Sequence, residues 1–85
     1  MAKKSLTRDE QFLVKVFELA QKGEDLFTLI DRYQVGLAIG QNHRSVDNIV
    51  RMLAQTNFIK KEEDPWIYLT SLGISLAKEL ILCKR

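Results

Sequence analysis

A tight turn between two helical patterns constrains this chain more than any other feature of its sequence. The turn is Gly40-Gln41-Asn42, in which glycine can adopt a positive φ and asparagine can cap a following helix. The apolar residues after it have the i, i+3, i+4, i+7 spacing of one buried helical face: Val46, Ile49, Val50 and Leu53. We therefore predict a helix over residues 43–56, ended by Asn57, a residue type that tolerates the left-handed conformation.

A second, shorter helix is predicted before the turn, over residues 32–39. Asp31 can accept from the backbone amides of its first turn, and Gln34 can reach back to complete a capping box. Gly36 on its apolar ridge is small enough to let the two helices approach closely. Two helices joined in this way form a helix-turn-helix.

Two further helices are predicted at the ends of the chain. Thr7 and Glu10 form a Thr-x-x-Glu capping box for a helix over residues 8–22, ended by Gly23 as a left-handed C-cap. Thr70 or Ser71 caps a closing helix over residues 71–83. Its apolar residues fall into two groups, with Leu72, Leu76, Leu80 and Cys83 on one side and Ile74, Ala77 and Ile81 on another.

The strand predictions rest on two regions. Residues 26–30 form an apolar run that is either a buried strand or one helical turn, and we favour the strand. Residues 58–69 have β-branched and aromatic residues on either side of Glu62-Glu63-Asp64-Pro65, which predicts a hairpin with a polar tip.

Length and composition limit the chain to one small domain. With 85 residues it can bury one modest core, and no second domain fits. A single cysteine, Cys83, excludes an internal disulfide and favours a reducing, cytoplasmic compartment. The first 15 residues lack the apolar core of a signal peptide, and no apolar run approaches the roughly 20 residues of a membrane span.

Several segments together resemble the winged helix-turn-helix of MarR-like transcriptional regulators. They are Val35-Gly36-Leu37-Ala38-Ile39-Gly40, Gln41-Asn42-His43-Arg44-Ser45-Val46, Asn57-Phe58-Ile59-Lys60-Lys61 and Tyr68-Leu69-Thr70-Ser71-Leu72-Gly73. The likeness covers roughly residues 8–82. It implies a mainly α fold with a small β-hairpin wing, built from a three-helix core, a two- or three-stranded antiparallel sheet and a C-terminal helix. It also implies binding of double-stranded DNA, although winged helices serve as protein docking modules too.

The predicted helix 43–56 has the residue types that a major-groove reader needs. If its apolar ridge faces inward, four hydrogen-bonding side chains point outward: Arg44, Asn48, Arg51 and Gln55. Phosphates would be held at the start of the helix and on the wing, by Asn42, His43, Ser45, Lys60 and Lys61. Any surface helix is polar on its outer face, and that simpler interpretation stays open.

The distribution of charge gives support and contrary indications. Residues 41–61 contain four cations, Arg44, Arg51, Lys60 and Lys61, against Asp47 alone. The wing tip, in contrast, has three carboxylates that a phosphate backbone would repel, and Asp47 is unfavourable unless it accepts from a cytosine amine. Either the wing points away from DNA, or Lys60 and Lys61 make the contact, or the partner is a basic protein. An acidic tip that merely discourages strand-edge association is equally compatible.

Other chemistries have little support. His43 and Cys83 are too isolated for a zinc site or a nucleophile pair, so we expect no metal, no cofactor and no enzyme activity. Val14, Ile74 and Ile81 widen the apolar faces of the terminal helices beyond what one core needs, which predicts a homodimer through those helices. We expect double-stranded DNA as the partner and no membrane association. The alternative is a winged helix that binds a protein and no DNA.

Overall fold

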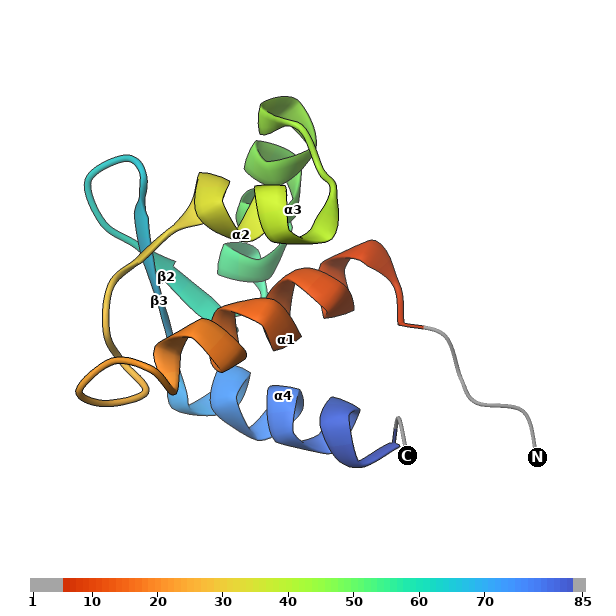
Figure 1. The fold of residues 1–85 in the computed structure, drawn as a ribbon, viewed down its shortest axis with the longest axis vertical. Coiled ribbons are helices and arrows are strands. Elements are labelled where there is room, and N and C mark those ends of the chain that lie inside the picture. Colours follow the sequence, from red (N-terminus) through yellow and green to blue (C-terminus); the bar gives the residue numbers. More distant parts are fainter. Residues whose placement is uncertain (1–5, 84–85) are drawn as a thin grey trace.

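The chain folds into four helices and a small three-stranded antiparallel sheet, in a computed structural model that describes residues 6–83 (Figure 1). The elements are α1 (Arg8–Ala20), β1 (Ile30–Asp31), α2 (Arg32–Ile39), α3 (His43–Gln55), β2 (Ile59–Lys61), β3 (Trp66–Leu69) and α4 (Ser71–Cys83). Helix α1 lies in the middle, with α4 along one side and α2 and α3 on the other. The sheet closes one end of the molecule. The fold is therefore mainly helical, as the sequence predicts.

One hydrophobic core lies between the helices and the sheet. Its buried side chains include Phe12 and Leu13 of α1, the ridge of α3, and Ile59, Ile67 and Leu69 of the sheet. The four ridge residues predicted from their spacing are all buried: Val46, Ile49, Val50 and Leu53. The opposite face of α3 is consequently left at the surface.

Helix α1 begins as predicted and ends differently. The capping box is present, since Thr7 Oγ1 accepts from the Glu10 amide and Glu10 Oε1 accepts from the Thr7 amide. The helix stops at Ala20, two residues earlier than expected, and the C-cap is Gln21 in a right-handed conformation. The prediction of a left-handed Gly23 is wrong. Gly23 instead packs closely against Thr28. A Cβ added at Gly23 would be only 2.8 Å from Thr28 Cγ2.

The strand predicted over residues 26–30 is mostly absent. Leu26 and Phe27 form a turn, because the Asp25 carboxylate accepts from the Phe27 amide at 2.8 Å. Such a side chain to backbone bond offers the chain a local alternative to a strand. Pairing starts only at Ile30, which lies opposite Ile67 of β3.

The α2–turn–α3 segment has the predicted geometry. Asp31 caps α2 by accepting from the Tyr33 amide, although no hydrogen bond from the Gln34 side chain completes a capping box within residues 6–83. Gly40 has a φ of 75°, the left-handed conformation expected of it. Gly36 is buried where α2 meets α3, and a Cβ there would overlap the side chain of Val46. A glycine is therefore required for this close packing.

The remaining elements follow the predicted order. Asn57 ends the α3 region with a φ of 66°, after a helix that stops at Gln55 and has Thr56 as its C-cap. Strands β2 and β3 form the predicted hairpin, and β3 lies in the centre of the sheet in the order β1-β3-β2. Helix α4 is capped by Thr70, whose hydroxyl oxygen accepts from the Gly73 amide.

The apolar faces of the terminal helices differ from expectation. Val14 is only 6% exposed, because α2 packs over α1 there and Val14 shares a surface recess with Ala38 and Ile39. Ile74 and Ile81 are half-buried against the core, whereas Leu72 and Leu82 are exposed. The prediction that Val14 is free to pair with a second copy is therefore wrong. The side chain of Cys83 lies outside the described residues.

None of the helices described between residues 6 and 83 is long and apolar enough to cross a membrane.

Candidate nucleic-acid interface

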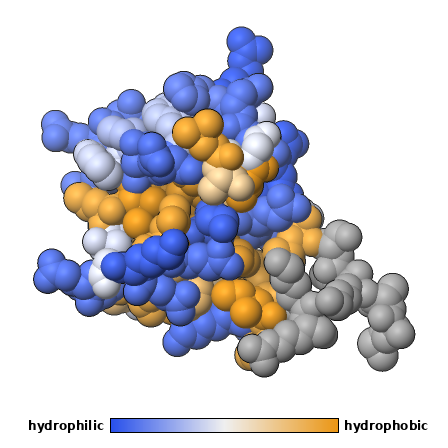
Figure 2. Space-filling view, in the orientation of Figure 1, coloured by the Kyte–Doolittle hydropathy of each residue, from blue (hydrophilic) through white to orange (hydrophobic). Residues whose placement is uncertain are grey.

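The outward face of α3 is open to solvent along its length. Its N-cap is Asn42, and the buried ridge turns the predicted stripe of Arg44, Asn48, Arg51 and Gln55 away from the core. All four of these side chains are exposed. Figure 2 shows mainly hydrophilic surface over this end of the molecule, with a hydrophobic patch in front where α2 ends. No other element within residues 6–83 covers the stripe.

Two residues of the stripe are already paired with each other. Arg51 Nη2 donates to Asn48 Oδ1 at 2.7 Å, an i, i+3 contact on the surface of α3. A guanidinium has five N–H donors, so Arg51 keeps four for a further partner. The Asn48 oxygen, in contrast, is occupied, and the two-point contact that asparagine makes with adenine needs that oxygen. This geometry leaves donors of Arg51 free for a further contact and occupies the Asn48 oxygen.

The first turn of α3 offers less to a phosphate than its sequence indicates. Asn42 Oδ1 accepts from the Ser45 amide at 2.9 Å, so this amide is already used, while the Asn42 amide group keeps its two donors. Ser45 is half-buried. The ring of His43 stacks on Tyr33 of α2, with 4.2 Å between the ring centroids. Asn42 is therefore the best placed of these three for contact with an anion.

Lys60 and Lys61 are both exposed on the edge strand β2. Lys60 lies opposite Tyr68, and Lys61 lies opposite Ile67. Strand β2 packs against α3 and begins shortly after that helix ends. The structure thus places both lysines at the surface of the strand that packs against α3.

Sequence reasoning missed Arg32, which is a buried cation beneath this surface. It is 8% exposed, and its Nε donates to the Pro65 carbonyl at 3.2 Å. Its terminal nitrogens lie 3.6 Å from Asp47 Oδ1 of α3 and 3.5 Å from Asp64 Oδ1 of the hairpin tip. The spacing of Arg32 to Val35 and Gly36, three and four residues later, could have indicated that it lies on the inward face of α2.

Asp47 is not the free, unfavourable charge expected from the sequence. Its carboxylate accepts from the Tyr33 hydroxyl at 2.8 Å and pairs with Arg32. The hydrogen bond to this carboxylate, together with partial desolvation, raises the pKa of Tyr33 above its usual value of 10.0. Asp47 therefore faces α2, where it shares the single positive charge of Arg32 with Asp64.

The three carboxylates of the hairpin tip also differ in whether they are paired. Asp64 is paired with Arg32, while Glu62 and Glu63 are exposed and have no salt bridge within residues 6–83. The tip is held by the Pro65 carbonyl, which accepts from both the backbone N–H and the Nε of Arg32. Two of the three predicted repulsive charges remain available to a partner.

No group of three or more His, Cys, Asp or Glu side chains close enough to bind a metal occurs among residues 6–83. Comparison with known proteins gives no match: no family model, no curated protein and no solved structure is significantly similar to this chain.

Proposed function

We propose that this protein is a small winged helix transcriptional regulator that binds double-stranded DNA sequence-specifically, with α3 inserted in the major groove. The observation that carries the proposal is the outward stripe of α3. It is exposed along its length, it consists of Arg44, Asn48, Arg51 and Gln55, and it lies opposite the buried ridge. These are the side chains that read base edges in the major groove, which is wide enough for an α-helix.

The charges around α3 support the same proposal. Arg44 and Arg51 have no salt bridge within residues 6–83, and neither have Lys60 and Lys61. The one carboxylate of α3, Asp47, is paired with Arg32. In this proposal Arg51, supported by Asn48, contacts guanine O6 and N7, and Arg44 contacts a second base. Asn42, Lys60 and Lys61 contact phosphates, with lesser contributions from His43 and Ser45.

The test is selection of bound duplexes from a random-sequence pool, followed by fluorescence anisotropy with the selected duplex at low and moderate salt. Arg44→Ala and Arg51→Ala should each weaken binding by about 1–3 kcal/mol and relax the sequence preference. Lys60→Ala should weaken binding to all duplexes alike. It should also reduce the slope of log affinity against log salt concentration by about one. Arg8→Ala, on the exposed start of α1, is the matched control. Failure to bind any duplex at low salt would exclude the proposal.

A homodimer is part of this proposal. Leu72 and Leu82 of α4 are more than half exposed, and pairing of the terminal helices would cover them. A two-fold dimer would present two α3 helices to half-sites about 34 Å apart. Sedimentation of the wild type and of Leu82→Glu tests this point, because the charged variant should be monomeric.

The second candidate is a docking module for a protein partner. Exposed Phe27, Leu29 and Trp66, together with the free carboxylates of Glu62 and Glu63, favour it. A nuclease-resistant complex from the native cell that Arg44→Ala and Arg51→Ala leave intact would support this candidate.

A further inference from the structure

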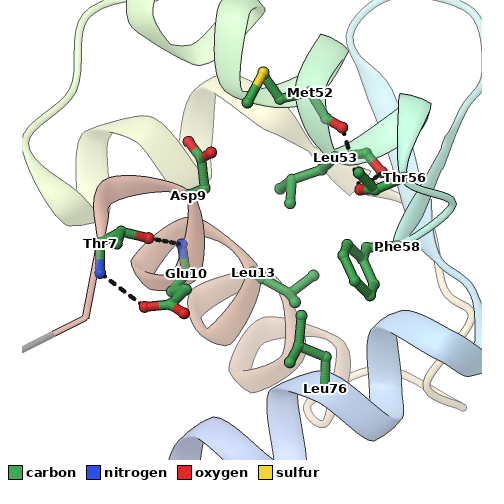
Figure 3. A pocket seen from close by; sticks show the side chains of 9 residues that line it. All are labelled: Thr7, Asp9, Glu10, Leu13, Met52, Leu53, Thr56, Phe58 and Leu76. Atoms are coloured by element: carbon green, nitrogen blue, oxygen red, sulfur yellow. Dashed lines mark hydrogen bonds between the residues drawn. The ribbon is translucent and has the colours of Figure 1, made fainter. Parts of the chain in front are cut away.

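Two surfaces outside the candidate nucleic-acid interface differ in whether contacts within the protein account for them. In the recess between the start of α1 and the end of α3, Thr7 and Glu10 hydrogen-bond to each other in the capping box (Figure 3). The Thr56 hydroxyl is bonded to the Met52 and Leu53 carbonyls. These polar groups already have partners, so the recess gives no indication of a ligand. The sheet, in contrast, has an apolar outer face and an edge with unpaired backbone groups.

The outer face of the sheet presents apolar side chains to solvent. Side chains of a strand point to alternate faces, and Ile67 of β3 is fully buried, so Trp66 before it faces outward. Trp66 is 42% exposed. On the neighbouring strand Ile30 is half-buried against the core, and Leu29 before it is 50% exposed. Leu29 and Trp66 therefore lie on the same, outward face.

Strand β1 leaves backbone groups unpaired at the edge of the sheet. Ile30 and Arg32 direct their backbone groups at β3, where the Arg32 amide donates to the Pro65 carbonyl. The amides of Leu29 and Asp31 point the other way and donate no hydrogen bond to another of residues 6–83. Free amides on an edge strand are a template for a further strand.

The two edges of the sheet are not equivalent. Strand β2, at the opposite edge, carries exposed Lys60 and Lys61, and lysines on an edge discourage strand addition. Residues 24–31, which lead into and form β1, contain no lysine or arginine. The edge of β1 therefore lacks the protection that β2 has.

The charges around Leu29 and Trp66 are mainly negative. Residues 24–31 and the unpaired part of the hairpin tip contribute these carboxylates: Glu24, Asp25, Asp31, Glu62 and Glu63. Lys60, opposite Tyr68 on the outer face, is outnumbered by them. Such a surface repels a phosphate polymer and attracts a basic segment. The indole face of Trp66 can also accept a guanidinium.

We propose that the edge of β1 and the adjoining outer face bind an extended peptide segment of a protein partner that combines basic and apolar side chains. Its backbone bonds to Leu29 and Asp31, its apolar side chains cover Leu29 and Trp66, and its cations approach the exposed carboxylates. This inference rests on the second candidate function, docking of a protein partner, and is independent of DNA binding.

The test is selection of phage-displayed random peptides, about nine residues long, on the immobilised full chain, followed by synthesis of the most enriched peptide. Trp66 is the only tryptophan, so its fluorescence reports directly on this surface. The peptide should contain arginine or lysine among apolar residues, bind saturably, protect Trp66 from quenching by acrylamide and shift the amide resonances of Leu29 and Asp31.

Three results would overturn the proposal. They are no enrichment of any peptide, enriched peptides without basic residues, and saturable binding that leaves Trp66 equally open to acrylamide. The third result would still be compatible with docking of a protein at another surface, so it separates this inference from the docking function itself.

A matched pair of variants tests the edge of β1. Leu29→Lys places a cation there and should weaken peptide binding about tenfold. Leu37→Lys makes the same change on α2, where the leucine is 74% exposed, and should leave the affinity unchanged. Native amide spectra of both variants establish that each is folded. If the two variants bind the peptide equally well, the proposal is wrong.

A second pair of variants tests the choice of a basic ligand. Glu62→Gln and Glu63→Gln keep the shape of the side chain and remove its charge, so each should weaken peptide binding about threefold at low salt. The same changes remove repulsion of a phosphate backbone and should not weaken duplex binding. Unchanged peptide affinity in both variants would contradict the proposal, because charge would then not select the ligand.

Discussion

Arg32 at the start of α2 pairs with Asp64 at the tip of the β2–β3 hairpin, with 3.5 Å between Nη2 and Oδ1. The same guanidinium lies 3.6 Å from Asp47 on α3. One nearly buried cation thus connects the hairpin and the helix that forms the candidate interface. The orientation of the hairpin relative to α3 therefore depends on a residue that belongs to neither element.

Replacing Arg32 with methionine tests this connection. Methionine keeps the apolar stem of the side chain but leaves the Pro65 carbonyl with one donor fewer and both carboxylates without their cation. Because Asp47 and Asp64 are 50% and 70% exposed, water screens much of the ion-pair energy. We expect Arg32→Met to lower the free energy of unfolding by about 1–2 kcal/mol, measured by urea denaturation. Arg8→Met should have almost no effect, and equal losses in both variants would contradict the role of Arg32.

The Tyr33–Asp47 hydrogen bond predicts a dependence of stability on alkaline pH. The carboxylate raises the pKa of Tyr33 in the folded state above the ordinary 10.0. The folded state therefore favours the protonated phenol, and this contribution to stability is complete below the unfolded pKa and lost as pH rises through the folded pKa. Thermal midpoints of the wild type and Tyr33→Phe, measured from about pH 8 to about pH 11, should converge at the alkaline end. A constant difference across this range would contradict the prediction.

Asp47→Asn is the matched test of the cause. Asparagine keeps an oxygen that can accept from the hydroxyl but removes the charge, so the pKa of Tyr33 should fall towards 10.0. The absorbance of ionised tyrosine, followed during alkaline titration, measures this change. A titration curve identical to that of the wild type would show that another group raises the Tyr33 pKa.

The sequence predicts those parts of the fold that depend on local spacing. The ridge of α3, the cap at Asn42 and the left-handed Gly40 each follow from residues a few positions apart, and each is confirmed. Gly23 shows the limit of this reasoning. Its role comes from contact with Thr28, and nothing in its immediate neighbours distinguishes that contact from a helix C-cap.

Spacing within one element likewise predicts only part of the candidate site. Exposure of Arg44 and Arg51 follows from the buried ridge on the opposite face of α3. The roles of Arg32 and Asp47 require the hairpin tip and α2 to come together in space, which no periodicity within one element indicates. The spacing in α1 wrongly predicts an exposed Val14 for the same reason, because α2 covers a face of α1 that a lone helix would leave exposed.

Gly73 and Gly40 should respond to alanine for different reasons. A Cβ at Gly73 of α4 would overlap the backbone carbonyl of Phe58, which cannot rotate away as a side chain can. A Cβ at Gly40 meets no atom within 4 Å, and the strain comes only from its φ of 75°. We expect Gly73→Ala to cost about 3 kcal/mol and Gly40→Ala about 1 kcal/mol in urea denaturation. Equal effects would contradict the close approach of α4 to Phe58, and Ser75→Ala on exposed α4 surface is the control.

The free carboxylates of the hairpin predict a gain of DNA affinity when they are neutralised. Glu62 and Glu63 are exposed and without a salt bridge within residues 6–83, whereas Asp64 is paired with Arg32. If the proposed DNA complex brings β2 near the phosphate backbone, Glu62→Gln and Glu63→Gln should each raise duplex affinity about threefold at low salt, with the gain shrinking as salt screens the charges. Glu24→Gln, before β1, is the control for overall charge. A gain of the same size in that control would show that the hairpin does not approach the duplex.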